Sequence, residues 1–567
     1  MNYIEQYNLW NSKKLEDEDL TEELKSISGS DKDIYERFYT NLKFGTAGLR
    51  GIIGAGSNRM NIYTLRRATK GLAEYLISNN KVNKIAIAFD SRNKSGLFAK
   101  TAASVLAANG IKVYLFEEIA PTPMLSWAVR YYGCTAGIVV TASHNPAEYN
   151  GYKVYGPDGC QISSAVADEV LSYIEKEDIF DIGFADYDAE VGKGNIEYVG
   201  NEAIDGYYNE VLKCRFNKPD MNRLTVAFTP LCGAGSIPVR KILQYIGINR
   251  LYVVEEQEKP DGSFKTCSYP NPEEPDAMKL GVELAERKLA DILIGTDPDA
   301  DRVGVAVRGK DGRYKLLTGN EVGVLLIDYI GKSLVENGSM PQNPLMVTSI
   351  VSTLLADAVA KSYGIETVRV LTGFKNIGEQ ILKLEEANQL ERFVFGFEES
   401  CGYLAGTYVR DKDAVVASML IAEMAAWYKE KGQTLIDVLD GIYDKFGYYS
   451  NKVINIAFEG AEGKEKMAGI MDFFYNTPPK QIDIYRGVEF VDYKKGIVVN
   501  KDGECSTNLP KADIFSITLE NGSTVIVRPS GTEPKLKIYL MIRGNDQSDA
   551  ETVSDKVALS LKNILKL

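Results

Sequence analysis

Apolar runs of five or six residues alternate with longer segments of mixed character along most of the chain. Three of these runs cover residues 84–89, 136–140 and 224–228, and they are rich in Ile, Val and Ala. Runs of this length and branching are typical of strands buried on both faces. The segments between them, such as 62–78, have the character of helices. This alternation predicts an α/β fold with a largely parallel sheet.

The same alternation restarts three times along the chain, near residues 205, 316 and 450. A chain of 567 residues is also long enough for about three or four domains. We therefore predict three α/β domains with mixed, largely parallel sheets, followed by a smaller α+β domain. The predicted domains are 1–205, 206–315, 316–445 and 446–567.

Composition and charge disfavour several classes of protein. The net charge of −13 argues against a general nucleic-acid binder, because such binding depends on neutralising phosphates with Lys and Arg. Seven cysteines are scattered singly, and there is one histidine, so a disulfide framework and a zinc site are both disfavoured. We find neither a signal-peptide pattern nor an apolar stretch of membrane-spanning length. We expect a soluble cytoplasmic protein without nucleic-acid or membrane partners.

The run at 136–140 ends abruptly in Thr141-Ala142-Ser143-His144-Asn145-Pro146. Ser143 should therefore lie at the carboxyl end of a strand, where open α/β sheets bind their ligands. Asn145-Pro146 should turn the chain, and Gly151 should allow another sharp bend. Ser143 is our candidate nucleophile, and the alternative is a serine that only caps a turn.

His144 is the only histidine of the chain and the immediate neighbour of Ser143. Adjacent side chains of an extended segment point to opposite faces, so His144 is poorly placed as the base for Ser143. Serine-hydrolase chemistry is therefore disfavoured. His144 is kept as a candidate catalytic residue because of its position.

A second strand end carries three carboxylates, Asp297, Asp299 and Asp301, at alternate positions. In an extended backbone they would project to one side and repel one another unless a cation lay between them. All-oxygen ligation favours a hard ion such as Mg²⁺. An EF-hand is ruled out because Arg302 and Arg308 occupy the places of its Gly and Glu. The alternative is a solvated acidic turn.

Three further loops carry candidate binding groups. The glycine-rich loop at 44–51 contains Arg50, and the apolar run 393–397 ends at Glu398, with Ser400 following. Carboxylates and hydroxyls can bind sugar hydroxyls, although Glu398 could equally cap a helix. The run 524–527 leads into a possible phosphate cradle, for which the alternative is an ordinary turn. The members of this cradle are Arg528, Ser530, Gly531 and Thr532.

Together and in this order, four of these motifs resemble the α-D-phosphohexomutase superfamily, the phosphoglucomutases and phosphomannomutases. The motifs are Thr141–Pro146, 297–302, 397–400 and 528–534, and they extend over nearly the whole chain. The metal loop and the Phe-Glu-Glu-Ser loop look most like the longer branch, with α-phosphoglucomutases and phosphopentomutase-type enzymes.

The resemblance implies four domains around a central cleft and a phosphorylated serine at Ser143. It implies Mg²⁺ held by Asp297, Asp299, Asp301 and a phosphoserine oxygen, with glucose 1,6-bisphosphate as activator. Arg302 beside the metal could stabilise the phosphoryl oxygens. Lys153 matches the family's proposed general acid/base. The resemblance also implies substrate-binding roles for Arg50, Glu398, Ser400, Arg410, Lys412, Arg528, Ser530, Gly531 and Thr532.

Two positions depart from the family pattern. Pro298 stands where relatives commonly have glycine, which should stiffen the metal loop without removing a ligand. Tyr403 stands where some relatives carry a histidine, so a catalytic histidine on that loop is excluded.

The expected activity is interconversion of glucose 1-phosphate and glucose 6-phosphate through a 1,6-bisphosphate. The alternatives are a phosphopentose or phosphomannose mutase, a glucose-1,6-bisphosphate synthase, or a non-catalytic sugar-phosphate sensor. We expect a monomer or weak dimer whose partner is a small sugar phosphate.

Overall fold

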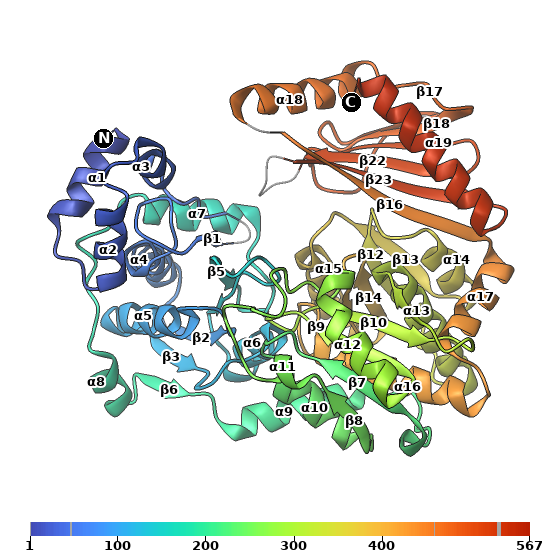
Figure 1. Cartoon of the computed structure of the whole chain (residues 1–567), viewed down its shortest axis with the longest axis horizontal. Coiled ribbons are helices and arrows are strands. Elements are labelled where there is room, and N and C mark those ends of the chain that lie inside the picture. Colours follow the sequence, from blue (N-terminus) through green and yellow to red (C-terminus); the bar gives the residue numbers. More distant parts are fainter. Residues whose placement is uncertain (1, 46–47, 459, 530–534, 567) are drawn as a thin grey trace.

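The structure, a computed structural model, describes residues 2–45, 48–458, 460–529 and 535–566. Four sheets follow one another along the chain, each with its own helices (Figure 1). Three of them have a parallel centre with antiparallel strands added at an edge, and the fourth is antiparallel throughout. This confirms the predicted fold class. The predicted domain limits remain a proposal, and the limit at 315 lies within β11 (Tyr314–Leu317).

The first sheet has the strand order β1-β5-β4-β2-β3-β6. Alternate residues of β2 face two different cores, with Ile85 and Ile87 in one and Ala86 and Ala88 in the other, which explains why this strand has an apolar sequence on both faces. Its strands are β1 (Leu49–Ile52), β2 (Lys84–Phe89), β3 (Lys112–Leu115), β4 (Ala136–Val140), β5 (Tyr149–Tyr155) and β6 (Ile196–Tyr198). The helices before and between them are α1 (Tyr3–Ser12), α2 (Glu18–Ser26), α3 (Asp31–Phe38), α4 (Ile62–Asn79), α5 (Ser95–Ala108), α6 (Thr122–Tyr132), α7 (Ser164–Ile174) and α8 (Tyr187–Gly192).

The second sheet has the order β11-β10-β9-β7-β8, and β9 and β10 form an antiparallel hairpin. Its strands are β7 (Thr225–Thr229), β8 (Arg250–Val253), β9 (Ile292–Thr296), β10 (Val303–Arg308) and β11. The helical segments here are α9 (Asn201–Lys213), η1 (Met221–Arg223), α10 (Ser236–Tyr245), α11 (Glu255–Glu258) and α12 (Pro275–Lys288).

The third sheet has the order β13-β12-β14-β15. Its strands are β12 (Leu345–Ser349), β13 (Glu366–Val370), β14 (Phe393–Glu398) and β15 (Gly402–Leu404). Its helical segments are α13 (Gly319–Glu336), α14 (Leu355–Ser362), α15 (Phe374–Glu386), η2 (Leu390–Arg392), α16 (Ala414–Glu430) and α17 (Leu435–Phe446).

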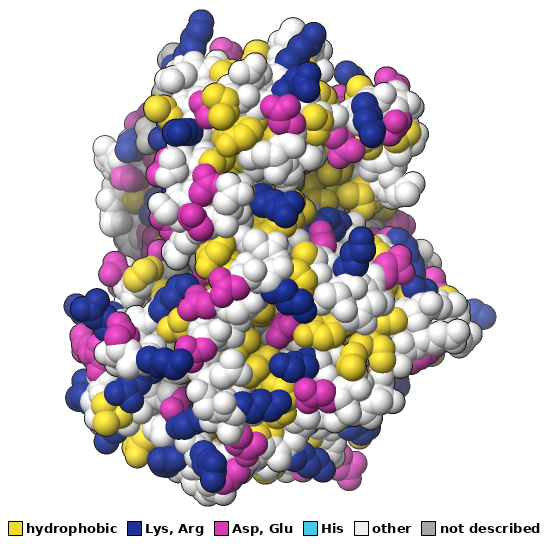
Figure 2. Space-filling model, turned by 90° about the vertical axis from the view of Figure 1, so that its right-hand side faces the viewer, with side chains coloured by type: hydrophobic (Ala, Val, Ile, Leu, Met, Phe, Trp, Pro, Cys, Tyr) yellow, Lys and Arg dark blue, Asp and Glu magenta, His cyan; other side chains and the backbone are white. Residues whose placement is uncertain are grey.

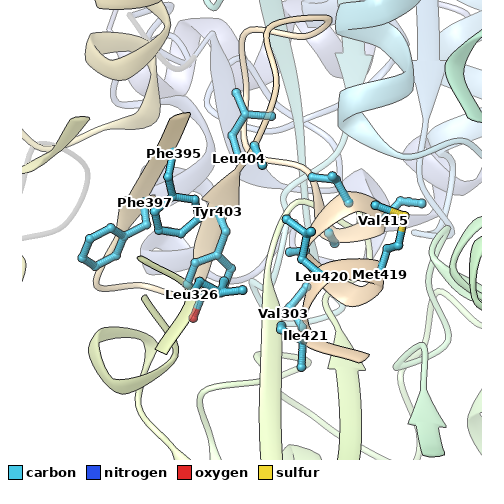
Figure 3. Close-up of a cluster of buried hydrophobic side chains, with 14 of the residues drawn as sticks. Val303, Leu326, Phe395, Phe397, Tyr403, Leu404, Val415, Met419, Leu420 and Ile421 are labelled. Atoms are coloured by element: carbon cyan, nitrogen blue, oxygen red, sulfur yellow. The ribbon is translucent and has the colours of Figure 1, made fainter. Parts of the chain in front are cut away.

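The second and third sheets share one apolar core. Val303 of β10 lies in the same buried cluster as Phe397 of β14 and Leu420 of α16 (Figure 3). Burial of this continuous apolar surface fixes the two α/β units against each other, since each Å² removed from water contributes about 25 cal/mol. The loops at the ends of β9 and β14 are therefore held in a fixed relation.

The fourth sheet lies at the upper right of Figure 1 and contains a core of its own. Its strands are β16 (Tyr448–Ala457), β17 (Gln481–Ile482), β18 (Tyr485–Asp492), β19 (Ile497–Asn500), β20 (Gly503–Ser506), β21 (Phe515–Leu519), β22 (Thr524–Pro529) and β23 (Lys535–Gly544). The helices with it are α18 (Gly460–Asn476) and α19 (Gln547–Leu565). A small second cluster, which includes Ile350 and Tyr539, joins this sheet to the third.

Glu423 on α16 is fully buried and anchors the segment that leads from the first sheet to the second. Its carboxylate accepts hydrogen bonds from Arg215 Nε at 2.7 Å and from the backbone N–H groups of Phe216 and Asn217 at 2.9 Å each. Tyr329 OH donates to the same carboxylate at 2.8 Å. A buried charge is tolerated only with such partners. The connecting segment is therefore fixed to the third sheet.

Acidic and basic side chains are interspersed on the face shown in Figure 2, without a continuous basic field. The seven cysteines are all unpaired. Within the described ranges, no helix has both the length and the apolar character that crossing a bilayer would require.

Candidate active site

Ser143 lies in a turn directly after β4, as predicted from the apolar run. Its backbone adopts the left-handed conformation, with φ 52°, and its N–H donates to Thr141 Oγ1 at 2.8 Å. For a residue with a side chain this conformation costs about 1–2 kcal/mol, so surrounding contacts must hold it. Ser143 Oγ donates to Asp297 Oδ2 at 2.8 Å. The nucleophile predicted from one domain thus touches the carboxylates of the next.

His144 does not point away from Ser143, and the expectation from an extended backbone is wrong here. Because Ser143 is left-handed, His144 Nδ1 lies 3.1 Å from Ser143 Oγ. Burial, together with the nearby Arg302 and Arg50 cations, holds the pKa of His144 well below its usual range. His144 is therefore a neutral imidazole that can exchange a hydrogen bond with the serine hydroxyl.

Gly151 does not make the predicted bend. It lies inside β5, opposite Arg50 of β1. A Cβ atom at this position would come within 2.5 Å of Thr141 O and 2.9 Å of Leu49 O. Glycine is needed here because three backbone segments approach closely.

The three aspartates converge in the turn between β9 and β10. This turn is not extended: Ala300 has φ 49°, and Asp297 Oδ1 accepts from the N–H groups of Asp301 and Arg302 at 3.1 and 3.0 Å. The predicted convergence is present, but a folded loop produces it rather than strand alternation. One carboxylate oxygen from each aspartate lies within 4.8 Å of the others.

The aspartate cluster fits a metal ion. All three carboxylates are buried, and Asp299 Oδ1 and Asp301 Oδ1 have no hydrogen-bond partner. Burial, and then the charges of Asp299 and Asp301, raise the pKa of Asp297. Buried oxygens without partners are costly unless a cation binds them, and an all-oxygen set suits a hard divalent ion. The chemistry of the site therefore supports a metal.

Two lysines from different domains lie against this cluster. Lys153 of β5 is 2.8 Å from Asp299 Oδ2, and Lys412 is 2.7 Å from Asp301 Oδ2. Burial opposes the charged form of Lys412, but the Asp301 and Asp411 carboxylates outweigh it and raise its pKa. Both lysines therefore lie where a phosphoryl group next to Ser143 would meet positive charge.

Arg302 links the metal loop to the loop after β14. Its Nη1 donates to Glu273 Oε1 at 2.9 Å and to the carbonyl of Ser400 at 3.0 Å. Arg50 lies on β1, and burial lowers its pKa. The charge of Asp299 opposes this shift, whereas the charge of Arg302 adds to it. Both arginines thus belong to the same charged site as the aspartates.

Glu398 ends β14 and is buried, with Oε1 accepting from Gly373 N at 2.7 Å. Burial, and then the neighbouring Glu399, raise the pKa of Glu398 to about 7. Glu399 accepts from Ser349 Oγ at 2.9 Å. A carboxylate in this setting can accept hydrogen bonds from hydroxyl groups of a ligand.

Arg528 lies at the end of β22 and contacts Thr372 Oγ1 on the third domain. It lines a cavity of about 1000 Å³ between the first, third and fourth domains, together with Gln161 and Lys375. The other predicted members of the phosphate cradle, Ser530, Gly531 and Thr532, lie outside the described residues.

Arg410 is not brought into the site. Its side chain is fully buried, and its guanidinium donates to Glu385 Oε2 at 2.9 Å and to the carbonyls of Thr407 and Val409. The prediction of substrate binding by Arg410 is therefore not supported. Arg410 and Lys412 carry the same charge in the sequence, and only packing distinguishes the two.

Several residues around the site were missed from the sequence. Thr122 Oγ1 donates to Asp299 Oδ2 at 3.0 Å, and Tyr155 OH donates to Asp411 Oδ2 at 2.7 Å. Neither has a local sequence signal, because each contacts a partner that is far away along the chain. Asp90 and Arg92 were also missed, although both directly follow the predicted strand at 84–89. Their position after a strand is the sequence feature that could have identified them.

Four adjacent α/β and α+β units hold a serine against a buried aspartate cluster between the first two, an arrangement that suits a multidomain phosphotransferase. Family models for phosphoglucomutase/phosphomannomutase match all four parts: α/β/α domain I at 41–180, domain II at 205–311, domain III at 318–446 and the C-terminal domain at 454–560. The chain belongs to the phosphoglucomutase/phosphomannomutase family.

Relatives cover nearly the full length of the chain. A phosphoglucomutase of Staphylococcus aureus strain MSSA476 is 38% identical over 526 residues, which is 92% of this chain and 93% of that protein. The phosphoglucomutase of strain USA300 is also 38% identical, over 520 residues, 91% and 92% of the two chains.

Solved structures share the fold. A putative phosphomannomutase from Thermus thermophilus has a TM-score of 0.68 at 20% identity, covering 93% of this chain and 100% of that one. The open form of parafusin, a phosphoglucomutase from Paramecium, has a TM-score of 0.67 at 18% identity, covering 93% and 94%.

Proposed function

We propose that this protein is a phosphoglucomutase, which interconverts glucose 1-phosphate and glucose 6-phosphate through phosphorylated Ser143 and a glucose 1,6-bisphosphate intermediate. One observation carries the proposal. Ser143 Oγ, from the first domain, lies 2.8 Å from Asp297 of a buried cluster of three aspartates in the second. A binding protein has no need for a hydroxyl held against such a cluster, whereas phosphoryl transfer depends on a positioned oxygen next to a site for a charge-neutralising cation.

In the proposed reaction the phosphoryl group passes from Ser143 Oγ to a free hydroxyl of the sugar phosphate. One O–P bond breaks and another forms, and the proton of the sugar hydroxyl replaces the phosphoryl group on Ser143 Oγ, with Lys153 assigned to this proton transfer. The bisphosphate then reorients in the site, and its other phosphoryl group passes to Ser143 Oγ as the serine proton passes to the new sugar hydroxyl. Lys412, Arg50 and Arg302 provide positive charge for the phosphoryl oxygens.

The remaining groups would hold the sugar. Glu398 and Ser400 are assigned to its hydroxyls, since Glu398 ends β14 and Ser400 lies in the loop after it, next to the metal loop. Arg528 is assigned to the phosphate that does not react, and the cavity of about 1000 Å³ beside it supports this role. Ser530, Gly531 and Thr532 complete the proposed cradle from the adjacent sequence.

We propose Mg²⁺ as the metal, held by Asp297, Asp299, Asp301 and a phosphoserine oxygen at Ser143. When bound, this ion would neutralise charge on the phosphoryl group. Glucose 1,6-bisphosphate is proposed as activator because it would restore phosphate to an unphosphorylated Ser143.

The proposal is tested by assaying glucose 1-phosphate with catalytic bisphosphate and Mg²⁺, beside the 1-phosphates of mannose, ribose, deoxyribose and N-acetylglucosamine. Glucose 1-phosphate should have the highest kcat/KM, and peptide mass analysis should find phosphate on Ser143. Ser143→Ala should lose both turnover and phosphate. The control Ser78→Ala, on the exposed end of α4, should keep both. Turnover by Ser143→Ala near the wild-type rate would contradict the mechanism.

We also propose that the protein acts in the cytoplasm as a monomer or weak dimer. The unpaired state of all seven cysteines supports a reducing compartment. Size-exclusion chromatography with light scattering would measure the oligomeric state.

A further inference from the structure

The turn that carries Ser143 is held by one arginine, Arg92, whose terminal N–H groups donate to backbone carbonyls rather than to the aspartates. Arg92 donates through Nη2 to the carbonyls of Ser143 and Asn145. Through Nη1 it donates to the carbonyls of Pro146 and Tyr149 at 2.8 and 3.1 Å. All four terminal N–H groups of the guanidinium are thus used by the backbone of this turn.

The sheet topology explains why Arg92 can reach this turn. β2 and β4 are parallel neighbours, with Phe89 opposite Val140, so the residues that follow them meet at one edge. Asp90 N donates to Val140 O at 3.1 Å, and Asp90 Oδ2 accepts from Thr141 Oγ1 at 2.6 Å. Arg92 Nε lies 3.3 Å from the same Oδ2. Asp90 therefore fixes both the start of the serine turn and the arginine.

The second domain closes over the other side of this arginine. The ring centroid of the buried Phe264 lies 5.0 Å from Arg92 Cζ. Gly262 packs so closely that a Cβ atom there would come within 2.4 Å of Asn93 N and 2.7 Å of Arg92 C. The guanidinium thus lies between the loop of the second domain and the serine turn.

We propose that Arg92 is a positioning residue for Ser143. It stabilises the left-handed conformation that points Oγ toward Asp297, and it sets the distance between the nucleophile of one domain and the aspartates of the next. It does not bind the phosphoryl group, because its terminal donors are already used. This inference rests on the proposed role of Ser143 as the phosphate carrier.

The test is Arg92→Lys, because lysine keeps the charge but cannot donate to four carbonyls from one planar group. A displacement of about 1 Å at a reacting atom can cost about 10²-fold in rate. We expect kcat to fall about 100-fold and KM for glucose 1-phosphate to stay within about threefold, since no substrate contact is removed. The ³¹P resonance of the phosphoserine should also shift or broaden.

Arg59→Lys is the matched control. Arg59 is also buried in the first domain and donates to two carbonyls, those of Glu36 and Asn58, away from the aspartates. Its replacement should leave kcat and the ³¹P resonance unchanged. Equal losses in the two variants, or a kcat for Arg92→Lys within threefold of wild type, would overturn the proposal.

Asp90→Asn decides the matter if Arg92→Lys does not fold. It removes the charge beside Arg92 and one acceptor for Thr141, so kcat should fall about tenfold at constant KM. An unchanged kcat would overturn the proposal. Peptide analysis of the wild-type protein separates this inference from the proposed function. If Ser143 carries no phosphate, the proposed function is wrong. If Ser143 carries phosphate, the kinetics of the variants test the role of Arg92 alone.

Discussion

Asp299 uses its two carboxylate oxygens differently. Oδ2 accepts from Lys153 and Thr122, whereas Oδ1 is buried without a partner. Asp299→Asn would keep the shape but lose the charge available to a cation. We expect kcat to fall about 10²–10³-fold and the Mg²⁺ concentration for half activity to rise. Mg²⁺ titration of the activity measures both.

The control for this variant is Asp291→Asn, just before β9 and so at the opposite end of that strand from the aspartate turn, where the carboxylate pairs with Lys429. It should keep the Mg²⁺ requirement of the wild type. If wild-type activity survived thorough chelation, the aspartate cluster would have a purpose other than metal binding.

Glu398 gives the protein a specific dependence of stability on pH. Its pKa is about 7 in the folded protein against the ordinary 4.5, because of burial and Glu399. The folded state thus holds a proton that the unfolded chain releases, so the free energy of unfolding falls as pH rises between these values. The loss approaches about 3 kcal/mol.

Glu398→Gln cannot titrate and should lack this loss. Urea unfolding from pH 4 to pH 8 should show the variant gaining on the wild type as pH rises through this window. Parallel stability curves for the two proteins would show that Glu398 is not responsible. kcat/KM should fall in the variant above pH 7, where the wild-type carboxylate is charged and the amide is not, and the difference should narrow below pH 7.

At the scale of single residues, the sequence identified most residues of the candidate site. It did not predict the directions of their side chains. Ser143 and the three aspartates were found because apolar strands end in them. The contact between His144 and Ser143 depends on a positive φ at a serine, which composition does not reveal. Arg410 and Lys412 are two residues apart in the sequence. Only the structure shows that Arg410 pairs with Glu385, whereas Lys412 lies against the aspartate cluster.

Among the elements, β5 depends on a glycine that the sequence assigned to a bend. In Gly151→Ala the new methyl group would push β1 and the end of β4 away from β5, which also carries Lys153. Overpacking of this kind costs about 1–3 kcal/mol. We expect a lower melting temperature and a reduced kcat, measured by calorimetry and assay.

Gly441→Ala is the comparison for this variant. Gly441 lies on the exposed side of α17 with open space around its Cα, so alanine should stabilise the helix by about 0.5–1 kcal/mol. Equal stability changes in the two variants would contradict the packing argument.

The strands that the sequence predicted well are those buried on both faces. The runs at 84–89, 136–140 and 393–397 correspond to β2, β4 and β14, because burial on both sides requires a continuous apolar sequence. The turn between β9 and β10 was read as extended, since alternate aspartates suit a strand as well as a loop. Its hydrogen bonds from backbone N–H groups to Asp297 are what decide the fold there.

At the scale of the whole molecule, one contact between domains is the hydrogen bond from Arg528 of the fourth domain to Thr372 of the third. Arg528→Lys keeps the charge but loses the bidentate geometry that suits a phosphate. We expect KM to rise, with a combined loss in kcat/KM equivalent to about 2–4 kcal/mol. Phosphate on Ser143 and the Mg²⁺ requirement should be unchanged, because both depend on the first two domains.

The control is Arg543→Lys, an exposed arginine on the neighbouring strand β23. Steady-state kinetics with glucose 1-phosphate should find it equal to the wild type. Loss of the metal requirement in Arg528→Lys, or an unchanged kcat/KM, would contradict the assignment of this residue to the distal phosphate.

The buried Glu423 has a consequence for how the chain is made. The N–H groups of Phe216 and Asn217 find their acceptor 207 and 206 residues further along the chain. On the ribosome, the segment after the first sheet therefore emerges long before α16 exists to receive it. Until then its donors remain with water, and the joint between the first two domains stays open. The segment between the first two domains can therefore gain these hydrogen bonds only after a helix of the third domain has been synthesised.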